Sequence, residues 1–471
     1  MAVSIDQRPL YTTLPIGQQI IFAVSENTIV AKKFKVKFIA EVHVSNKAIN
    51  ISSGNSVIGT FKTTPNNAGV GIFDLRPILE TFVKSDNEAS EGDTSYKLDK
   101  DIDFPMHLID RFAMSENAIR NFAIQFKVEW SETANGEMVS GQAANSDEYL
   151  FFNGVLQYDD VLTLGKINTS GHLVKGNNYG YNLKTFQVEF PGDQKSFLTN
   201  APTNQYARIT DYGTLAFFNL YKNQNVYKVL YKFYKEDNTL IGSYSVGNAS
   251  TTGGVTKPTG NTSERLLYVA MSPGNLRGHN SVVDGYFASG EVAYYKLSLQ
   301  DSSSVNLSQI ITIYTICPNE RGYEGIRLGW LNQWGTWDYY TFNMKSTRSI
   351  TTKRIPYTQS GGTWNESTFK ISGWKGGKKN FRVNSTEKIK INTDFVTEAE
   401  GVWFEELINS SEVYIVNGYE VLDVKDTITN KYIEPVVLTT SSYVKKTIAN
   451  DKLMQYTFEI EKSKMKRTQA V

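Results

Sequence analysis

The sequence predicts a mainly β protein, with tandem antiparallel β-sandwich domains and a C-terminal α+β module that contains one capped helix. The first observation is that several segments alternate apolar and polar residues with a period of two, as half-buried antiparallel strands do. The second is that 35 glycines and abundant Asn, Ser and Thr supply turns between these segments. The third is that a single segment near the C-terminus has helical spacing instead.

The length of 471 residues predicts more than one hydrophobic core. We expect a β-sandwich domain at 1–155, a connecting segment at 156–210 and a second β-sandwich domain at 211–350. The C-terminal α+β module is expected at 351–471.

The clearest early strand runs from Phe34 to Val44. It places Phe34, Val36 and Phe38 on one face and lysines on the other. The same alternation recurs in three later segments, at 122–130, 226–234 and 292–299. We interpret all four as half-buried antiparallel strands.

The same order of features occurs twice, in 34–154 and in 226–335. Each copy has a long strand, a short segment, a polar loop, an apolar segment, a proline-containing segment and further strands. The last of these features aligns 149–154 with 330–335. This order predicts that the second sandwich repeats the first, and the alternative is independent β-domains that share generic patterning.

The helix is predicted at about 398–409. Thr397 and Glu400 form a capping box, in which each side chain satisfies a backbone amide of the first turn. Glu405 and Glu406 are expected to face solvent. The apolar residues that recur at helical spacing are Val402, Trp403, Phe404, Leu407 and Ile408.

Two strands are expected after this helix, at 412–416 and 455–461. The second strand continues into a basic tail, from Lys462 to Arg467. A tail of this kind is usually solvated, and the alternative is an electrostatic contact with an acidic neighbour.

Composition excludes several classes of function. With 49 basic and 48 acidic residues, the chain has no overall field to attract nucleic acid or an anionic membrane, so any such contact must be local. No segment is long and apolar enough for a membrane helix, so no membrane insertion is expected. The N-terminus has no basic region followed by an apolar run, which predicts synthesis in a cytoplasm without export. The single cysteine, Cys317, rules out an intrachain disulfide and is expected to be a small buried residue at the end of strand 310–317.

Candidate catalytic or metal-binding groups are few. His43, His107, His172 and His279 are scattered and lack metal-ligand spacing. Asp99–Asp103 lacks the glycine and distal glutamate of a calcium loop. Trp374–Lys379 lacks the spacing of a phosphate loop and is better interpreted as a basic hairpin turn. We therefore expect no catalytic residue, no cofactor and no metal site.

The aromatic run at 327–342 is the densest feature of the sequence. Three tryptophans, two tyrosines and a phenylalanine are punctuated by Gly329 and Gly335, which predicts two strands joined at a corner. Such a run either fills a core or forms a contact surface between chains. It could also be a sugar-stacking platform beside Asp338, with glycan binding or cleavage as its function.

Several segments carry a family resemblance. The aromatic run with its flanks (325–346) and the helix with its flanks (395–415) resemble parts of uncharacterised structural proteins of tailed bacteriophages that infect Bacteroidetes and marine bacteria. The other segments that share this resemblance are 59–65, 71–74, 434–438 and 456–461. The resemblance implies a β-rich virion component of the tail, neck or baseplate that is made in the host cytoplasm, and it supplies no active-site residue.

In such a role the chain is expected to form a closed ring with copies of itself and to contact other virion proteins. A ring contact is heterologous, so one chain must carry two different complementary surfaces. The polar loops at 86–95 and 247–261 are expected to order against neighbours. The competing function is a glycan-binding protein that recognises the phage receptor. The residues predicted to hold protomers together, with core packing as the alternative for each, are Trp330, Trp334, Trp337, Tyr339, Tyr340, Trp403 and Phe404.

Overall fold

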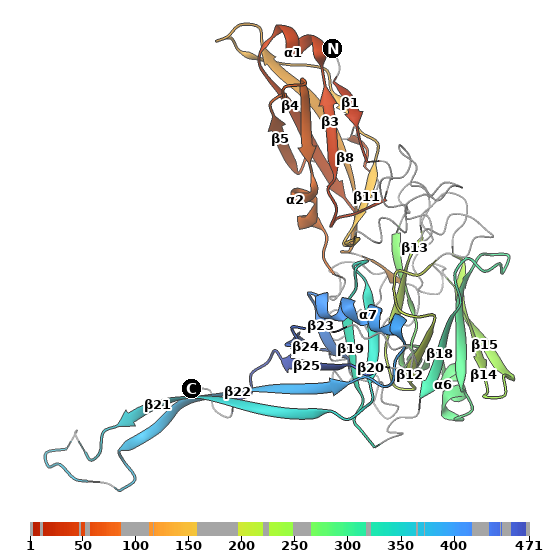
Figure 1. Cartoon of the computed structure of the whole chain (residues 1–471), viewed down its shortest axis with the longest axis vertical. Helices are drawn as coiled ribbons and strands as arrows, with labels where there is room; N and C mark the ends of the chain where they lie inside the picture. Colours follow the sequence, from red (N-terminus) through yellow and green to blue (C-terminus); the bar gives the residue numbers. More distant parts are fainter. Residues whose placement is uncertain are drawn as a thin grey trace. The chain divides into compact units, whose positions relative to one another are not determined.

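The computed structural model is mainly β, which confirms the predicted fold class. The residues that the model describes are 3–9, 13–46, 49–51, 57–85, 113–115, 117–157, 196–219, 226–247, 265–316, 322–363, 366–371, 373–416, 433–442, 444 and 454–467. Figure 1 draws these residues in colour. Cys317, His107, His172, Asp99–Asp103, the loop at 86–95 and nearly all of the loop at 247–261 lie outside them.

The chain divides into two compact units. The described residues up to Ile316, together with Leu331–Asp338, form unit 1. The described residues in 322–330, Tyr339–Val416 and the residues from Ile433 onward form unit 2. The predicted domain limits at 155, 210 and 350 stay predictions.

The first part of unit 1 is built from two facing sheets (Figure 1). The larger sheet has the order β2-β11-β8-β4-β5, and the smaller has the order β1-β3-β6. The strand bounds are β1 Ser4–Gln7, β2 Thr13–Pro15, β3 Ile21–Ser25, β4 Phe34–Ser45, β5 Gly59–Thr63, β6 Val70–Asp74, β8 Ile119–Ser131 and β11 Tyr149–Phe152, with β9 Met138–Ser140 and β10 Ala144–Asn145 also paired to β8.

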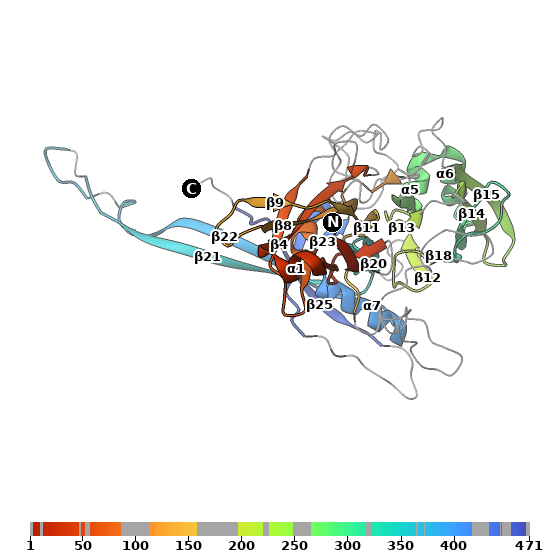
Figure 2. The same ribbon diagram turned by 90° about the horizontal axis from the view of Figure 1, so that it is seen from above.

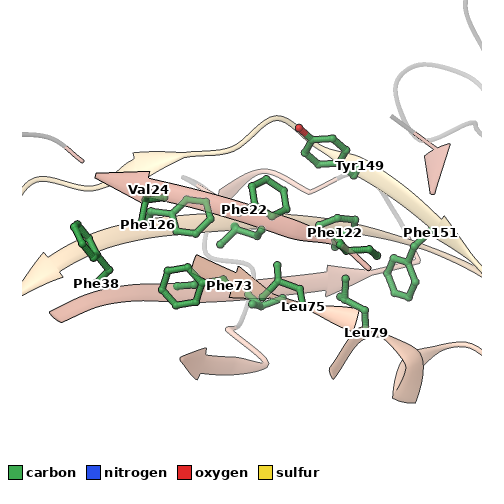
Figure 3. Close-up of a cluster of buried hydrophobic side chains, with 14 of the residues drawn as sticks. Phe22, Val24, Phe38, Phe73, Leu75, Leu79, Phe122, Phe126, Tyr149 and Phe151 are labelled. Carbon is green, nitrogen blue, oxygen red and sulfur yellow. The ribbon is translucent and has the colours of Figure 1, made fainter. Parts of the chain in front are cut away.

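Aromatic side chains from both sheets meet in one core (Figure 3). The ring centroid of Phe22, on β3, lies 5.6 Å from that of Phe126 and 5.7 Å from that of Tyr149, which come from the facing sheet. Phe34 does not share this core as predicted and is exposed. A β-bulge between Phe34 and Lys37 interrupts the alternation at this end of β4.

The same strand order recurs in the second part of unit 1. Its larger sheet has the order β12-β18-β17-β14-β15, and β12 pairs with β18 in parallel as β2 pairs with β11. The predicted order of features agrees with this up to β18, but its last step is wrong, because β18 and not 330–335 occupies the place of β11. The strand bounds are β12 Asn204–Arg208, β14 Lys228–Tyr234, β15 Leu240–Gly247, β17 Tyr294–Gln300 and β18 Ile311–Ile316, with a smaller sheet of β13 Thr214–Asn219, β16 Arg265–Ala270 and β7 Ala113–Met114.

Short helices follow the equivalent strands β6 and β16. Both α2, at Arg76–Leu79, and α5, at Pro273–His279, have a proline in the first turn, where the missing amide costs no hydrogen bond. The structure adds α1 at Asn27–Lys32, α6 at Ser281–Ala288 and a 3-10 turn at Glu80–Phe82.

Unit 2 contains a sheet with the order β20-β19-β23-β24-β25-β22-β21, which α7 packs against. The helix α7 spans Glu398–Asn409 and has the predicted capping box of Thr397 and Glu400. Val402, predicted as apolar face, is instead exposed. The strand bounds are β19 Ile326–Leu331, β20 Trp337–Phe342, β21 Thr347–Gln359, β22 Gly377–Asn392, β23 Val413–Val416, β24 Ile433–Leu438 and β25 Thr457–Lys462.

Candidate interaction surface

The aromatic residues predicted to join protomers lie inside the chain. Trp330 packs on Trp403 with ring centroids 4.9 Å apart, and Tyr340 packs on Phe404 at 4.8 Å. Their apolar surface is therefore covered within one chain, which is the arrangement expected if these residues pack in a core. Of the seven, Tyr340 is half-buried, and the buried ones are Trp330, Trp334, Trp337, Tyr339, Trp403 and Phe404.

The corner of the aromatic run is a tight hairpin that a polar network holds in unit 1. Gly335 has a φ of +72°, and a Cβ at this position would lie 1.7 Å from the carbonyl oxygen of Asn153. The buried Asp338 accepts hydrogen bonds from the Thr199 hydroxyl at 2.6 Å and from the Asn332 amide at 3.1 Å. Asp338 thus has a structural role here, and the tryptophans beside it offer no open face for a sugar.

The structure also locates other residues that the sequence analysis considered as possible functional groups. His43 is buried in β4. Trp374–Lys379 is only partly a turn as predicted, because β21 ends at Gln359 and Gly377–Lys379 already belong to β22. The basic tail pairs within its own chain, since Lys466 forms a salt bridge with Glu387 at 2.6 Å. Within the described ranges, no group of three His, Cys, Asp or Glu side chains is close enough to hold a metal ion. No described helix has the length and apolar character needed to cross a bilayer.

A long two-stranded ribbon is the most exposed part of unit 2. Strands β21 and β22 pair from Thr347 to Gln359, whereas β22 pairs with β25 only from Lys388 to Asn392. A single bridge from Ser385 to Lys466 follows. Beyond it, the described strands of the ribbon pair only with each other, and Figures 1 and 2 show them projecting past the rest of their sheet. We call residues 350–384 the arm; its free strands span roughly 25 Å at the usual rise per residue.

The arm exposes large apolar side chains. Ile371 is 83% exposed, Trp374 is 73% exposed and Phe369 is 65% exposed. A lone two-stranded hairpin is marginally stable in water, and apolar surface of this extent normally marks a binding face. The other large apolar residues exposed on the arm are Ile350, Ile355, Tyr357, Phe381 and Val383.

The arm is also strongly basic. It carries seven basic residues against one acidic residue, Glu366, although the whole chain has a net charge of +1. The Nζ atom of Lys375 lies 5.1 Å from the ring centroid of Trp374, a cation–π distance. The seven basic residues are Lys353, Arg354, Lys370, Lys375, Lys378, Lys379 and Arg382.

The tip of the arm has a defined conformation. The backbone N–H of Thr363 donates to the carbonyl of Lys370 at 2.9 Å, and the N–H of Lys370 donates back to the Thr363 hydroxyl at 3.0 Å. Gly362 has a φ of +78°, and a Cβ there would lie 2.4 Å from the ring of Phe369. These contacts fix Gly362, Thr363, Phe369 and Lys370 relative to one another.

A second surface lies on the larger sheet in the second part of unit 1. Tyr206, Tyr314, Tyr294 and Tyr234 stand in register across four neighbouring strands. The rings of Tyr234 and Tyr294 are 5.0 Å apart and nearly parallel, at 11°, so their faces cover each other. Burial raises the pKa of Tyr294, and the neighbouring Tyr234 and Tyr314 raise it further.

A groove of about 430 Å³ opens beside this tyrosine row. It offers ammonium, amide and hydroxyl groups, and no carboxylate is among its lining residues, which are Leu230, Lys232, Tyr234, Lys296, Ser298, Gln300, Ser304, Asn306 and Ile310. Sequence reasoning missed the groove, and of the arm it found only the basic segment Trp374–Lys379. The clustered lysines of the arm were the one visible signal.

No protein-family model matches this sequence, and no curated protein matches it.

Proposed function

We propose that the chain is a non-enzymatic structural component of a tailed-phage virion, in the tail, neck or baseplate, that acts through contacts with its own copies and with other virion proteins. The observation that carries the proposal is the arm. It combines exposed apolar side chains, a high positive charge and an ordered tip, and it projects from the sheet that supports it. A feature of this kind gains stability when it packs on a second protein.

The proposed location rests on the resemblance to phage structural proteins, and the burial pattern supports a scaffold role. The aromatic side chains of unit 2 form a core around α7, which gives the arm a rigid base. Within the described residues, the buried carboxylate of the aromatic run, Asp338, is engaged by Thr199 and Asn332, as a structural group is.

The test is to find the chain in purified phage particles. Peptides of the chain should appear in the protein composition of the particles at a stoichiometric level. Gold-labelled antibody should bind at one site on the tail, neck or baseplate. Absence of the chain from purified particles would refute the proposal.

Glycan recognition is the second candidate, and the groove beside Tyr234 favours it. Lys296, Gln300 and Asn306 supply the donors and acceptors that sugar hydroxyls need. A glycan array with the full chain should give binding that Tyr234→Ala and Asn306→Ala both weaken. Tyr227→Ala is the matched control, because Tyr227 is exposed but does not line the groove.

A further inference from the structure

Charge is segregated along the sequence of unit 2. The arm carries its excess of basic residues, while residues 391–416 contain six acidic residues and no basic residue. The acidic residues are Asp394, Glu398, Glu400, Glu405, Glu406 and Glu412. The near-zero net charge of the chain thus averages over two surfaces of opposite sign.

The helix α7 presents part of this acidic segment to solvent. Trp403, Phe404 and Leu407 face the core, so residues spaced by four and three on the other side face outward. These are Glu398, Val402 and Glu405, which we call the α7 stripe; Glu398 and Val402 are exposed, and Glu405 is half-buried. Val402 is 52% exposed, and Phe395, just before the helix, is 59% exposed. The α7 stripe therefore combines negative charge with apolar surface, as the arm combines positive charge with apolar surface.

The arm does not reach the α7 stripe of its own chain. It leaves the sheet at the β21–β22 edge, whereas α7 packs on side chains of β19, β20 and β25. Both views show the arm projecting away from α7 (Figures 1 and 2). One chain therefore carries two complementary surfaces that do not contact each other within the chain.

We propose that the arm of one copy docks on the α7 stripe of a second copy of this chain. This inference rests on the proposed function, for which it names the contact between copies. The contact is heterologous, so it repeats from copy to copy and closes a ring where the rotation allows. Ile371, Trp374 and Phe381 bury against Val402 and Phe395, and the basic residues of the arm face the glutamates of the helix.

Docking uses side chains rather than strand addition. Among the described residues, both edges of the arm are free of other strands. The edge of β21 contains Lys353 and Pro356, with a bulge between Ile355 and Pro356, and the edge of β22 carries Lys378, Lys379 and Arg382. Lysine, proline and bulges at an edge oppose pairing with another strand. A basic ribbon with aromatics also suits nucleic acid, but the exposed Ile350, Ile355 and Ile371 gain more from an apolar protein surface than from phosphates.

The test is charge reversal in the full chain, followed by sedimentation velocity. Arg354→Glu with Lys378→Glu reverses the arm, and Glu398→Lys with Glu405→Lys reverses the α7 stripe. Among the described residues, neither Arg354 nor Lys378 forms a salt bridge, so the arm variant breaks no intrachain pair. The matched control is Lys32→Glu with Lys37→Glu, which makes the same charge change on exposed lysines of unit 1 that do not line the groove.

The unaltered chain and the control should form multimers. Each reversed variant should associate at least about tenfold more weakly, because like charges then face each other across the contact. The combination of both reversals should restore association. Thermal unfolding of every variant shows that it is folded.

Three results would overturn the inference: a chain that stays monomeric at high concentration, an arm reversal that leaves association unchanged, or a combination that does not restore it. A fourth is loss of binding to a short DNA duplex by the arm variant with unchanged association, which would assign the arm to nucleic acid. Labelling of particles separates the two proposals. If the chain is found in particles but its self-association does not depend on the arm, the virion role stands and the proposed contact is refuted. If the chain associates through the arm but is absent from particles, the contact stands and the virion role is refuted.

Discussion

Trp330 on β19 and Trp403 on α7 lie with their ring centroids 4.9 Å apart and their planes inclined at 44°. The contact joins the sheet of unit 2 to its helix, and both indoles are buried. Trp403 also stacks on Phe404, with centroids 5.2 Å apart. This pair therefore ties α7 to the sheet that carries the arm.

Trp403→Ala should lower the free energy of unfolding by about 3–5 kcal/mol, because it removes a large buried ring and leaves a cavity. Chemical denaturation followed by circular dichroism measures this. Val402→Ala, on the next residue but exposed, should change stability by less than about 0.5 kcal/mol. Equal effects of the two substitutions would contradict the assignment of Trp403 to the core.

The capping box gives a smaller effect. The Thr397 hydroxyl accepts from the N–H of Glu400 at 3.3 Å, and the Glu400 carboxylate accepts from the N–H of Thr397 at 2.7 Å. Thr397→Ala should cost about 1 kcal/mol of stability, and Thr397→Ser should retain most of it. If thermal melting shows serine to be as costly as alanine, the hydroxyl does not act as a cap.

Two glycines should respond to alanine in opposite directions. Gly335→Ala forces a left-handed backbone on a residue with a Cβ and drives that Cβ into Asn153, so we expect a loss of more than about 2 kcal/mol. Gly285 lies within α6, with open space around its Cα, and Gly285→Ala should raise stability by about 0.5–1 kcal/mol. Melting temperatures of the two variants, measured side by side, test the sign of each change.

Glu387 makes the stability of unit 2 depend on pH. The hydrogen bond from Lys466 holds the pKa of Glu387 below its ordinary value of 4.5, and the charges of Lys462 and Arg348 act in the same direction. Because the pKa is lower in the folded chain, the stabilisation is present above pH 4.5 and is lost as the pH falls through the folded pKa.

Lys466→Met should therefore destabilise the chain at neutral pH and have little effect once Glu387 is protonated. Denaturation series at several pH values measure the difference between the variant and the unaltered chain. Lys32→Met is the control, since Lys32 is exposed and far along the sequence from Glu387. A difference that stays constant down to the acid range would exclude this ion pair as its source.

Local signals account for what the sequence predicted well. The start of α7 follows from the side chains of Thr397 and Glu400, which act within one turn. The strands at 34–44 and 122–130 follow from period-two alternation and pair in the structure as β4 and β8. Such features depend on near neighbours, and the sequence displays these directly.

Features that depend on distant neighbours were not predictable in the same way. The burial of Trp334 and Trp337 depends on the fold around the hairpin, and aromatic residues suit cores and interfaces equally. The charge of the arm was not recognised because its basic residues and the acidic residues of 391–416 cancel in the net charge of +1. Counting charge in windows would have shown both surfaces.

The hairpin between β19 and β20 affects how this chain can be shortened. Its corner, Leu331–Asp338, belongs to unit 1, although the chain reaches it only through unit 2. A fragment ending at Ile316 would lose Asn332 and Asp338, and with them the partners of the Leu198 carbonyl and the Thr199 hydroxyl. A truncation at the sequence boundary between the two units would therefore destabilise unit 1, because one of its segments is encoded further downstream.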